Sequence, residues 1–407
     1  MERKAKEKRG ITLIALVVTI VVLLILAGIT INMLFSNGGI FKTAQDAANA
    51  WNEATVNEQE SLNNLADQIG NLVNGQVGGG TGTDEPEDPT KGPNGKPLVD
   101  NITEIQTENN VEAEDKYGNP VVVPKGFKVV VNETTNNATT VPEGIVIEDG
   151  AGNQFVWIPT GTYKIDESGT TKTNELTRRQ WGTTANTVQE PTPITGDEVA
   201  SGSEGAFYYG EGDTRSVAHD TIASFLNSAK SVSEGGNGGF YIGRYEQGEG
   251  NVCKAGVNAY VNVSSTVAKT KAKAMYTNKN QYGATSELIN SYAWDTALNF
   301  ICQNSEHGYT LATTTDDTYG NIGTGSSGKT LTGGYPADCY SNIYDFLGNC
   351  AEWTTEYSSN RVDDSNTTPS VDRGGSHRNS GGYAAMRSNN STVNFYDYFS
   401  FRISLYV

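Results

Sequence analysis

The sequence is poor in histidine and cysteine. Among its 407 residues are three histidines and four cysteines. His219, His307 and His377 are widely separated and follow no spacing typical of metal ligands. No glycine-rich stretch follows a predicted strand and opens a helix, as a phosphate-binding loop would. We therefore expect no enzymatic activity and no redox cofactor.

Positive charge is also scarce. The chain has 29 lysines and arginines against 47 aspartates and glutamates, which gives a net charge of −18. Proteins that bind nucleic acid present a basic surface to the phosphates, so nucleic acid is not an expected partner. Five of the basic residues stand together in 1–10, directly ahead of an apolar run.

That apolar run, Ile11 to Leu34, carries no charged residue. About 20 apolar residues suffice to cross a bilayer as a helix, and a basic flank stays in the cytoplasm. The run is too long for a cleavable signal peptide and lacks the small-x-small site at which such peptides are cut. It predicts a single-pass protein of the cell membrane whose carboxyl-terminal part is extracellular.

The start of the run has a second feature. Lys8-Arg-Gly10 is followed by Ile11-Thr-Leu-Ile-Ala-Leu-Val, and this resembles the class III signal of type IV pilins. The resemblance implies cleavage between Gly10 and Ile11 by a prepilin peptidase and packing of the helix against other pilin subunits. Apolar residues continue at helical spacing, so a long membrane or pilin-like helix with an amphipathic extension is predicted over 11–69.

Ala15 departs from the pilin pattern. Pilins normally carry a glutamate at this position, the fifth after the glycine, which pairs with the amino terminus of a neighbouring subunit. Since a buried carboxylate is costly unless it is paired, Ala15 removes one assembly contact. The chain then fits a minor or tip pilin, and the alternative is a plain membrane anchor that never polymerises.

Composition divides the rest of the chain. Residues 70–117 are rich in Gly, Asn, Thr, Asp and Pro, and such segments behave as flexible linkers. Further on, short apolar runs between turn residues predict strands, and 220–229 and 292–301 have apolar residues at helical spacing. The predicted strands cover 120–124, 127–131, 144–147, 154–158 and 240–245. The predicted domains are a basic leader at 1–10, a helix at 11–69, a linker at 70–117 and a loop-rich α+β domain at 118–407.

Five stretches of the last domain occur in the order of a known family. They are Phe155–Pro159, Gly239–Glu246, Asp345–Trp353, Arg373–Ser376 and Phe401–Arg402. This set resembles the formylglycine-generating-enzyme (sulfatase-modifying-factor) domain, a variant of the C-type lectin fold, over residues 147–407. The resemblance implies a lectin-like fold in which long loops on a compact scaffold carry the binding. It also implies that Arg373, Arg387 and Arg402 are structural and bond to loop carbonyls or to acids such as Glu352.

The catalytic residues of that family are missing. Its oxidases use a cysteine pair after the Gly-Gly-Ser motif, with copper, and a second enzyme branch uses three iron-binding histidines. Here residues 377–387 contain no cysteine, and the three histidines are not clustered. The alternative function is that of a formylglycine-generating-type or iron-dependent oxidase, but the chain lacks the cysteine pair and the clustered histidines that these enzymes use.

The same resemblance implies a structural calcium ion. Family members hold calcium at the loop with the Gly-Asn-x-x-Glu-Trp motif, which maps onto Asp345, Gly348, Cys350 and Glu352. Carboxylate and carbonyl oxygens are the ligands that calcium prefers. The alternative is that Asp345 and Glu352 cap turns or pair with arginine.

The four cysteines, Cys253, Cys302, Cys339 and Cys350, would lie outside the membrane, where disulfides can form. Four cysteines permit three pairings. The alternative is that some of them are small buried hydrophobic residues.

The last segment closes on Phe401-Arg402-Ile403 and resembles the variable region of diversity-generating retroelement target proteins, with Ser400 where those have glycine. Adenine-directed mutation of asparagine codons yields Asn, Ser, Tyr, Asp, His, Arg and Gly, among other residues. Such residues are common here, and Tyr, Asn and Ser suit an adaptable binding surface. The predicted ligand-binding rim consists of His377, Arg378, Asn379, Ser380, Tyr383, Ser388, Asn389, Asn390, Ser391, Tyr396, Asp397 and Tyr398.

These features together favour a cell-surface or pilus-tip protein that displays a non-catalytic lectin-like domain. The expected partners are the membrane, other pilin subunits, the prepilin peptidase and an unknown protein or glycan ligand. A structural minor pilin with an inert head is a further alternative.

Overall fold

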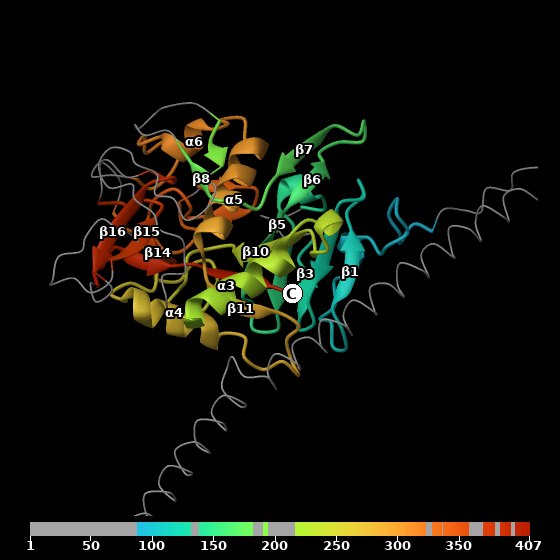
Figure 1. The fold of residues 1–407 in the computed structure, drawn as a ribbon, viewed down its shortest axis with the longest axis horizontal. Coiled ribbons are helices and arrows are strands. Elements are labelled where there is room, and N and C mark those ends of the chain that lie inside the picture. The colour runs from blue at the N-terminus through green and yellow to red at the C-terminus, as the bar shows by residue number, and fades with distance from the viewer. Residues whose placement is uncertain are drawn as a thin grey trace, which may run out of the picture. The chain divides into compact units, whose positions relative to one another are not determined.

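The computed structural model describes most of the second of two compact units, which begins at Glu87 (Figure 1). The described residues are 88–131, 138–181, 190–193, 216–322, 328–335, 337–357, 369–378, 383–391 and 395–407. The predicted leader, the predicted helix at 11–69 and the processing site at Gly10 and Ile11 lie outside these residues. Within them, no helix combines the length and the apolar character needed to cross a membrane.

The folded unit begins earlier than the sequence predicts. Residues 88–117 were expected to belong to a flexible linker, but Val99 and Ala113 in this segment are buried. Strand β1 (Val111–Glu114) pairs with β2 (Pro120–Val123), and this pairing fixes the segment against the domain. The predicted linker therefore ends before residue 88, because a few apolar residues among many polar ones are enough to bury one face of a hairpin.

A six-stranded antiparallel sheet forms the centre of the unit, in the order β11-β18-β10-β5-β4-β3. Its strands are β3 (Phe127–Val129), β4 (Val146–Asp149), β5 (Gln154–Pro159), β10 (Gly239–Gly243), β11 (Thr285–Leu288) and β18 (Ile403–Tyr406). All five residues of the central strand β10 are buried, as is Trp157 in β5. The expected strands at 127–131, 144–147, 154–158 and 240–245 are thus confirmed, and β3 and β4 form one edge of the sheet.

The helices are α3 (Ser216–Ala229), α4 (Ser265–Ala274), α5 (Ser291–Asn304) and α6 (Thr310–Thr313). Helix α5 begins where the Asn290 side chain accepts a hydrogen bond from the Ala293 N–H, a typical N-cap. The predicted helices correspond to α3 and α5. Helix α4 was not predicted, because its buried face consists of Ser265, Ala268 and Ala272 rather than large apolar residues.

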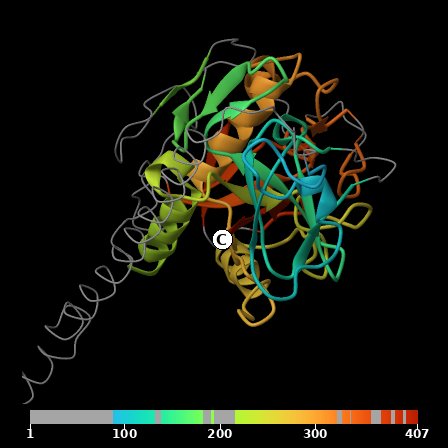
Figure 2. The same cartoon turned by 90° about the vertical axis from the view of Figure 1, so that its right-hand side faces the viewer.

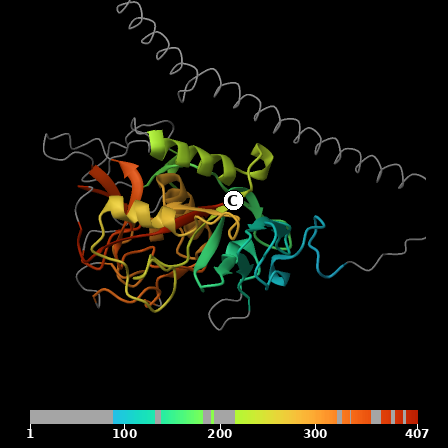
Figure 3. The ribbon, with the colours of Figure 1, turned by 90° about the horizontal axis from the view of Figure 1, so that it is seen from below.

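A second, four-stranded sheet has the order β16-β15-β14-β17. Its strands are β14 (Ala351–Tyr357), β15 (Pro369–Arg373), β16 (Arg387–Ser391) and β17 (Phe399–Phe401), and β17 runs parallel to β14. Figures 1 and 3 show this sheet at one end of the unit and β1 and β3 at the other, and Figure 2 views the unit from the side on which β1 lies. Small antiparallel pairs complete the fold: β6 (Gly161–Lys164) with β7 (Thr171–Asn174), β8 (Arg179–Gln180) with β9 (Thr192–Pro193), and β12 (Cys339–Tyr340) with β13 (Ile343–Tyr344). The described chain is therefore mixed α+β and rich in strands and loops, as expected.

Candidate functional site

A hollow of about 350 Å³ opens beside the four-stranded sheet. It is lined by Ala351, Asp372, Gly375, Ser376, Arg378, Met386, Ser388, Tyr398 and Phe399. These residues come from β14, β15, β16, the turn after β15 and the chain entering β17. Three of them, Arg378, Ser388 and Tyr398, belong to the predicted rim, so the fold brings separate parts of that rim to one concave site.

An exposed aromatic ridge stands next to this hollow, in the segment before β17. Phe395 is 64% exposed and Tyr396 is 42% exposed. The rings of Tyr396 and Tyr398 are stacked, with centroids 5.2 Å apart and planes 9° from parallel. Contiguous exposed apolar surface marks interaction sites more often than single exposed residues do, and aromatic residues are frequent at the centres of interfaces.

An ion pair joins the two rim segments. The Arg378 guanidinium lies 2.7 Å from the Asp397 carboxylate, and both side chains are about half exposed. The same guanidinium lies over the Tyr398 ring, 5.7 Å from its centroid. These contacts place the turn after β15 beside the segment before β17, next to the hollow.

The other predicted rim residues fall into three groups. Half-buried His377 has its ring Nδ1 2.7 Å from the Asn349 carbonyl oxygen, and half-buried Tyr383 packs against the core. Asn379 and Ser380 lie outside the described residues. Asn389, Asn390 and Ser391 form part of β16, and only their backbone is described.

Sequence reasoning missed much of the floor of the hollow. Asp372 is opposite Ser388 in the pairing of β15 with β16, while Met386 and Phe399 supply apolar surface. Asp372 stands immediately before the Arg373-Gly-Gly-Ser motif, but nothing in the linear sequence pairs it with Ser388. Only the strand register places the two side by side.

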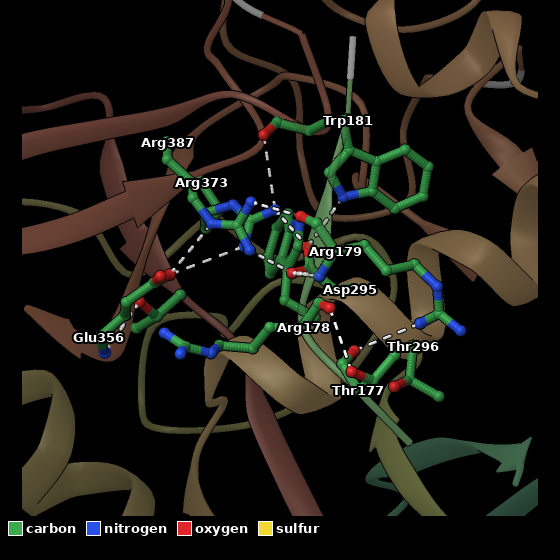
Figure 4. Close-up of polar contacts among 12 residues, drawn as sticks. Thr177, Arg178, Arg179, Trp181, Asp295, Thr296, Glu356, Arg373 and Arg387 are labelled. Carbon is green, nitrogen blue, oxygen red and sulfur yellow. Dashed lines mark hydrogen bonds and ion pairs between the residues drawn. The ribbon is translucent and has the colours of Figure 1, made fainter. Parts of the chain in front are cut away.

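Beneath the rim strands lies a buried network of charges (Figure 4). Asp295 of α5 accepts hydrogen bonds from Arg373, at 2.7 Å, and from Arg387. Glu356 of β14 lies 3.3 Å from Arg387 and 3.8 Å from Arg373. All four side chains are at most 3% exposed. The predicted structural role of both arginines is confirmed, since they fasten β15 and β16 to α5.

Two further groups complete the bonds of Asp295. The Arg179 backbone N–H and the Trp181 indole N–H donate to its oxygens at 2.8 and 3.0 Å. Burial alone would favour the neutral acid, yet Arg387 and Arg373 outweigh burial and lower the pKa of Asp295. The carboxylate is therefore ionised at neutral pH and serves as the common acceptor of the network.

The predicted calcium ligands lie near a second buried ion pair. Arg402 donates to both carboxylate oxygens of Glu352, the shortest distance being 2.7 Å, and also to the carbonyls of Tyr344, Asp345 and Gly243. The predicted structural role of Arg402 is thus confirmed. In the described ranges, no group of three His, Cys, Asp or Glu side chains is placed to hold a metal ion. Glu352 of the predicted set is paired with Arg402, while one carboxylate oxygen of buried Asp345 accepts no hydrogen bond, and calcium at Asp345, Gly348, Cys350 and Glu352 stays a prediction.

Asn349, in the middle of that motif, connects the surrounding loops. Its side-chain oxygen accepts hydrogen bonds from the Asn321 amide and the Thr330 backbone N–H, and its own amide donates to Glu246. Its carbonyl accepts the His377 backbone N–H at 3.1 Å. The motif therefore positions the turn that carries His377 and Arg378, which gives it a structural role beneath the predicted rim.

Four buried carboxyls surround this motif: Glu246, Asp338, Asp345 and Glu352. Burial raises the pKa of all four, to about 6 for Asp345 and to about 7 for Glu352 even though Arg402 opposes the shift. A carboxyl with a raised pKa binds more protons in the folded than in the unfolded state. Its contribution to stability is therefore complete below the unfolded pKa and is lost as the pH rises through the folded pKa.

We expect the full chain to become less stable as the pH rises from about 4.5 to about 7, by at least about 2 kcal/mol. Thermal unfolding of the folded unit, followed by near-ultraviolet circular dichroism between those pH values, measures this change. An Asp345→Asn variant, which keeps a neutral group at this site, should show a shallower dependence. A melting temperature that rises over this range, or a slope unaltered by the substitution, would contradict the expectation.

All four cysteines are free in the structure. Cys253, Cys302 and Cys350 are buried, and Cys339 is partly buried. Three of the cysteines are therefore small buried residues, as the alternative interpretation predicted. None of the possible disulfide pairings is made.

Comparisons with known proteins return structural similarity alone. No protein-family model matches the chain, and no curated protein sequence does. The crystal structure of CarF is 16% identical and has a TM-score of 0.33, over 42% of this chain and 87% of that one. The structure of PvdO from Pseudomonas aeruginosa is 13% identical with a TM-score of 0.36, over 64% and 98%. Treponema denticola variable protein 1 is 12% identical with a TM-score of 0.27, over 69% and 99%.

Proposed function

We propose that this chain is a surface-displayed binding protein whose rim captures an extracellular protein or glycan. The observation that supports this function best is the open ridge of Phe395 and Tyr396 beside the hollow lined by Arg378, Ser388 and Tyr398. A hollow of this volume falls in the range of ligand sites. Aromatic and arginine side chains are also the residues that most often dominate binding energy.

The rim is built on a rigid base. Buried arginines anchor β15 and β16, and Arg378 ties the two rim segments together through Asp397. Side chains held in place before binding lose less entropy when the partner arrives. Such an arrangement suits recognition, with substitutions in the rim altering which ligand is bound while the base is unchanged.

The remaining parts of the proposal come from the sequence. The apolar run at 11–34 would tether the domain to the membrane or place it in a pilus, with the domain on the extracellular side. The rim would be diversified by a retroelement, since Arg378, Ser388, Tyr396, Asp397 and Tyr398 are all residues that adenine-directed mutation of asparagine codons yields. A template repeat near the gene that differs only at adenines would support the last point, and a genome without a reverse transcriptase would refute it.

The function is tested on an array of purified extracellular proteins and glycans probed with the full chain in detergent. We expect a Phe395→Ala, Tyr396→Ala double variant to bind its array ligand at least about 30-fold more weakly, equivalent to about 2 kcal/mol. Its unfolding transition should be unchanged, because both side chains are exposed.

A double variant at Val232 and Val267 provides the matched control. These residues are 56% and 42% exposed, lie in neither the hollow nor the ridge, and are also changed to alanine. Their variant should bind as the parent does. Equal binding by the ridge variant would overturn the function and would favour the structural pilin with an inert head.

A further inference from the structure

A second exposed segment, the 328–333 loop, lies beside the aromatic ridge. The Lys329 ammonium donates a hydrogen bond to the Asp397 backbone carbonyl at 3.4 Å and so joins the loop to the ridge segment. Five large hydrophobic side chains are exposed in the described part of the chain, and three of them are Leu331 and the two residues of the ridge. Apolar side chains gathered on one face of a protein mark an interaction site.

The 328–333 loop is fixed by the residues between its exposed side chains. The Thr330 N–H donates to the Asn349 side-chain oxygen at 2.9 Å. Thr332 is fully buried, and its carbonyl accepts the Gly256 N–H at 2.8 Å. Asn349 also holds the turn after β15, so the loop and the rim share one support. Side chains held in place before binding lose less entropy when a partner arrives.

The exposed charges at the junction of loop and ridge favour an anionic partner group. Arg378 pairs with the Asp397 carboxylate at 2.7 Å, while Lys329 contacts only the carbonyl of that residue. Lys329 is exposed, and its ammonium has no carboxylate partner among the described residues. Asp372, the other acid nearby, is 2% exposed and engaged within the protein. One positive charge is therefore left in excess at this surface, on a chain whose net charge is −18.

The apolar residues of this surface favour a protein over a sugar as the partner. A leucine side chain has no ring face on which a sugar can stack and no group that bonds to sugar hydroxyls. Interfaces between proteins combine an apolar centre, rich in aromatic residues, with a polar border. Leu331 and the ridge supply such a centre, and Lys329 supplies a charged group beside it.

We propose that the 328–333 loop is a second wall of the binding face, where Leu331 packs on an acidic protein partner and Lys329 pairs with one of its carboxylates. This inference rests on the proposed binding function and names the partner class. An ion pair between exposed groups adds little affinity. Lys329 therefore acts mainly on the choice of partner and on the rate of association.

The test uses saturation-transfer difference NMR titrations on the full chain in detergent. The probes are three pools of acetylated peptide amides with a leucine-phenylalanine centre, flanked by glutamate, glutamine or lysine. At low ionic strength we expect the glutamate pool to bind at least about 3-fold more tightly than the glutamine pool, and the lysine pool most weakly. This difference should vanish in about 0.5 M salt.

Three outcomes with the parent chain would overturn the proposal. They are equal binding of the three pools, no binding of any pool, and binding of glucuronate in place of the glutamate pool. The last result would identify an acidic sugar, and not a protein, as the source of the carboxylate.

Two variants locate the probe. Lys329→Glu should invert the preference, so that the lysine pool binds more tightly than the glutamate pool, and Leu331→Ala should weaken all pools at least about 3-fold. Both side chains are exposed, so the unfolding transition should be unchanged. Lys164→Glu is the matched control, because Lys164 of β6 is exposed and also makes no ion pair in the described ranges. An unchanged preference in Lys329→Glu, or an equal change in Lys164→Glu, would refute the second wall.

The experiment separates this inference from the function on which it rests. If the two loop variants bind as the parent does while the ridge double variant still loses its array ligand, the second wall is wrong and the binding function stands. If neither the loop variants nor the ridge variant alters binding, the binding function fails as well.

Discussion

Asp295→Asn is expected to lower the free energy of unfolding of the folded unit by about 3–5 kcal/mol, the effect typical of breaking a buried ion pair. The substitution removes one of the two carboxylates that buried Arg373 and Arg387 share, and leaves Glu356 as the other. It also places an amide, which is itself a donor, where the carboxylate accepts from the Trp181 indole. Urea unfolding of the full chain, followed by near-ultraviolet circular dichroism, measures the change.

An exposed ion pair offers the matched control for this prediction. Arg378 and Asp397 are also 2.7 Å apart, but their side chains are 56% and 50% exposed. Asp397→Asn is therefore expected to change the stability by less than about 1 kcal/mol. If the two substitutions had equal effects, burial would not be the reason that the Asp295 network matters.

Arg402→Lys is expected to cost about 3 kcal/mol or more, although it conserves the charge. The guanidinium holds Glu352 and three backbone carbonyls at once. A lysine ammonium carries three donors on a different geometry, so it leaves buried acceptors without partners. The same urea experiment applies, with the expected loss seen as a lower midpoint at an unchanged slope.

Arg378→Lys is the control for this second substitution. The Arg378 guanidinium is half exposed and bonds to a single carboxylate. Water can therefore replace any hydrogen bond to that carboxylate that a lysine at this position does not make. We expect a change within about 1 kcal/mol. A small effect at Arg402 as well would mean that the Gly-Asn-x-x-Glu-Trp loop does not depend on its arginine.

The Asp295 network and the Arg402 network lie in different parts of the folded unit, but both support the predicted rim. Asp295 holds the strands β15 and β16, and Arg402 holds the loop whose Asn349 carbonyl binds His377. Loss of either should reduce ligand binding through loss of folding. The ridge variants should reduce ligand binding without any loss of folding. Comparing binding with stability therefore distinguishes the supporting networks from the contact surface.

The sequence alone could predict the elements that depend on local pattern. The strand at 154–158 and the helix at 292–301 follow from apolar periodicity, and the structural roles of Arg373, Arg387 and Arg402 follow from the motifs around them. Helix α4 escaped prediction because alanines form its buried face. The start of the folded unit at residue 87 escaped as well, because β1 gains its stability by pairing with β2.

What the sequence by itself determined is the division into an apolar start and a strand-rich domain, and the choice of polar and aromatic residues in its last segment. Only the tertiary structure decided that Arg378, Ser388 and Tyr398 share a hollow, that Asp372 lines it, and that Arg402 pairs with Glu352. The physical reason is that periodicity and composition act over neighbouring residues. A concave site or a buried ion pair depends instead on the register of strands that are far apart in the chain.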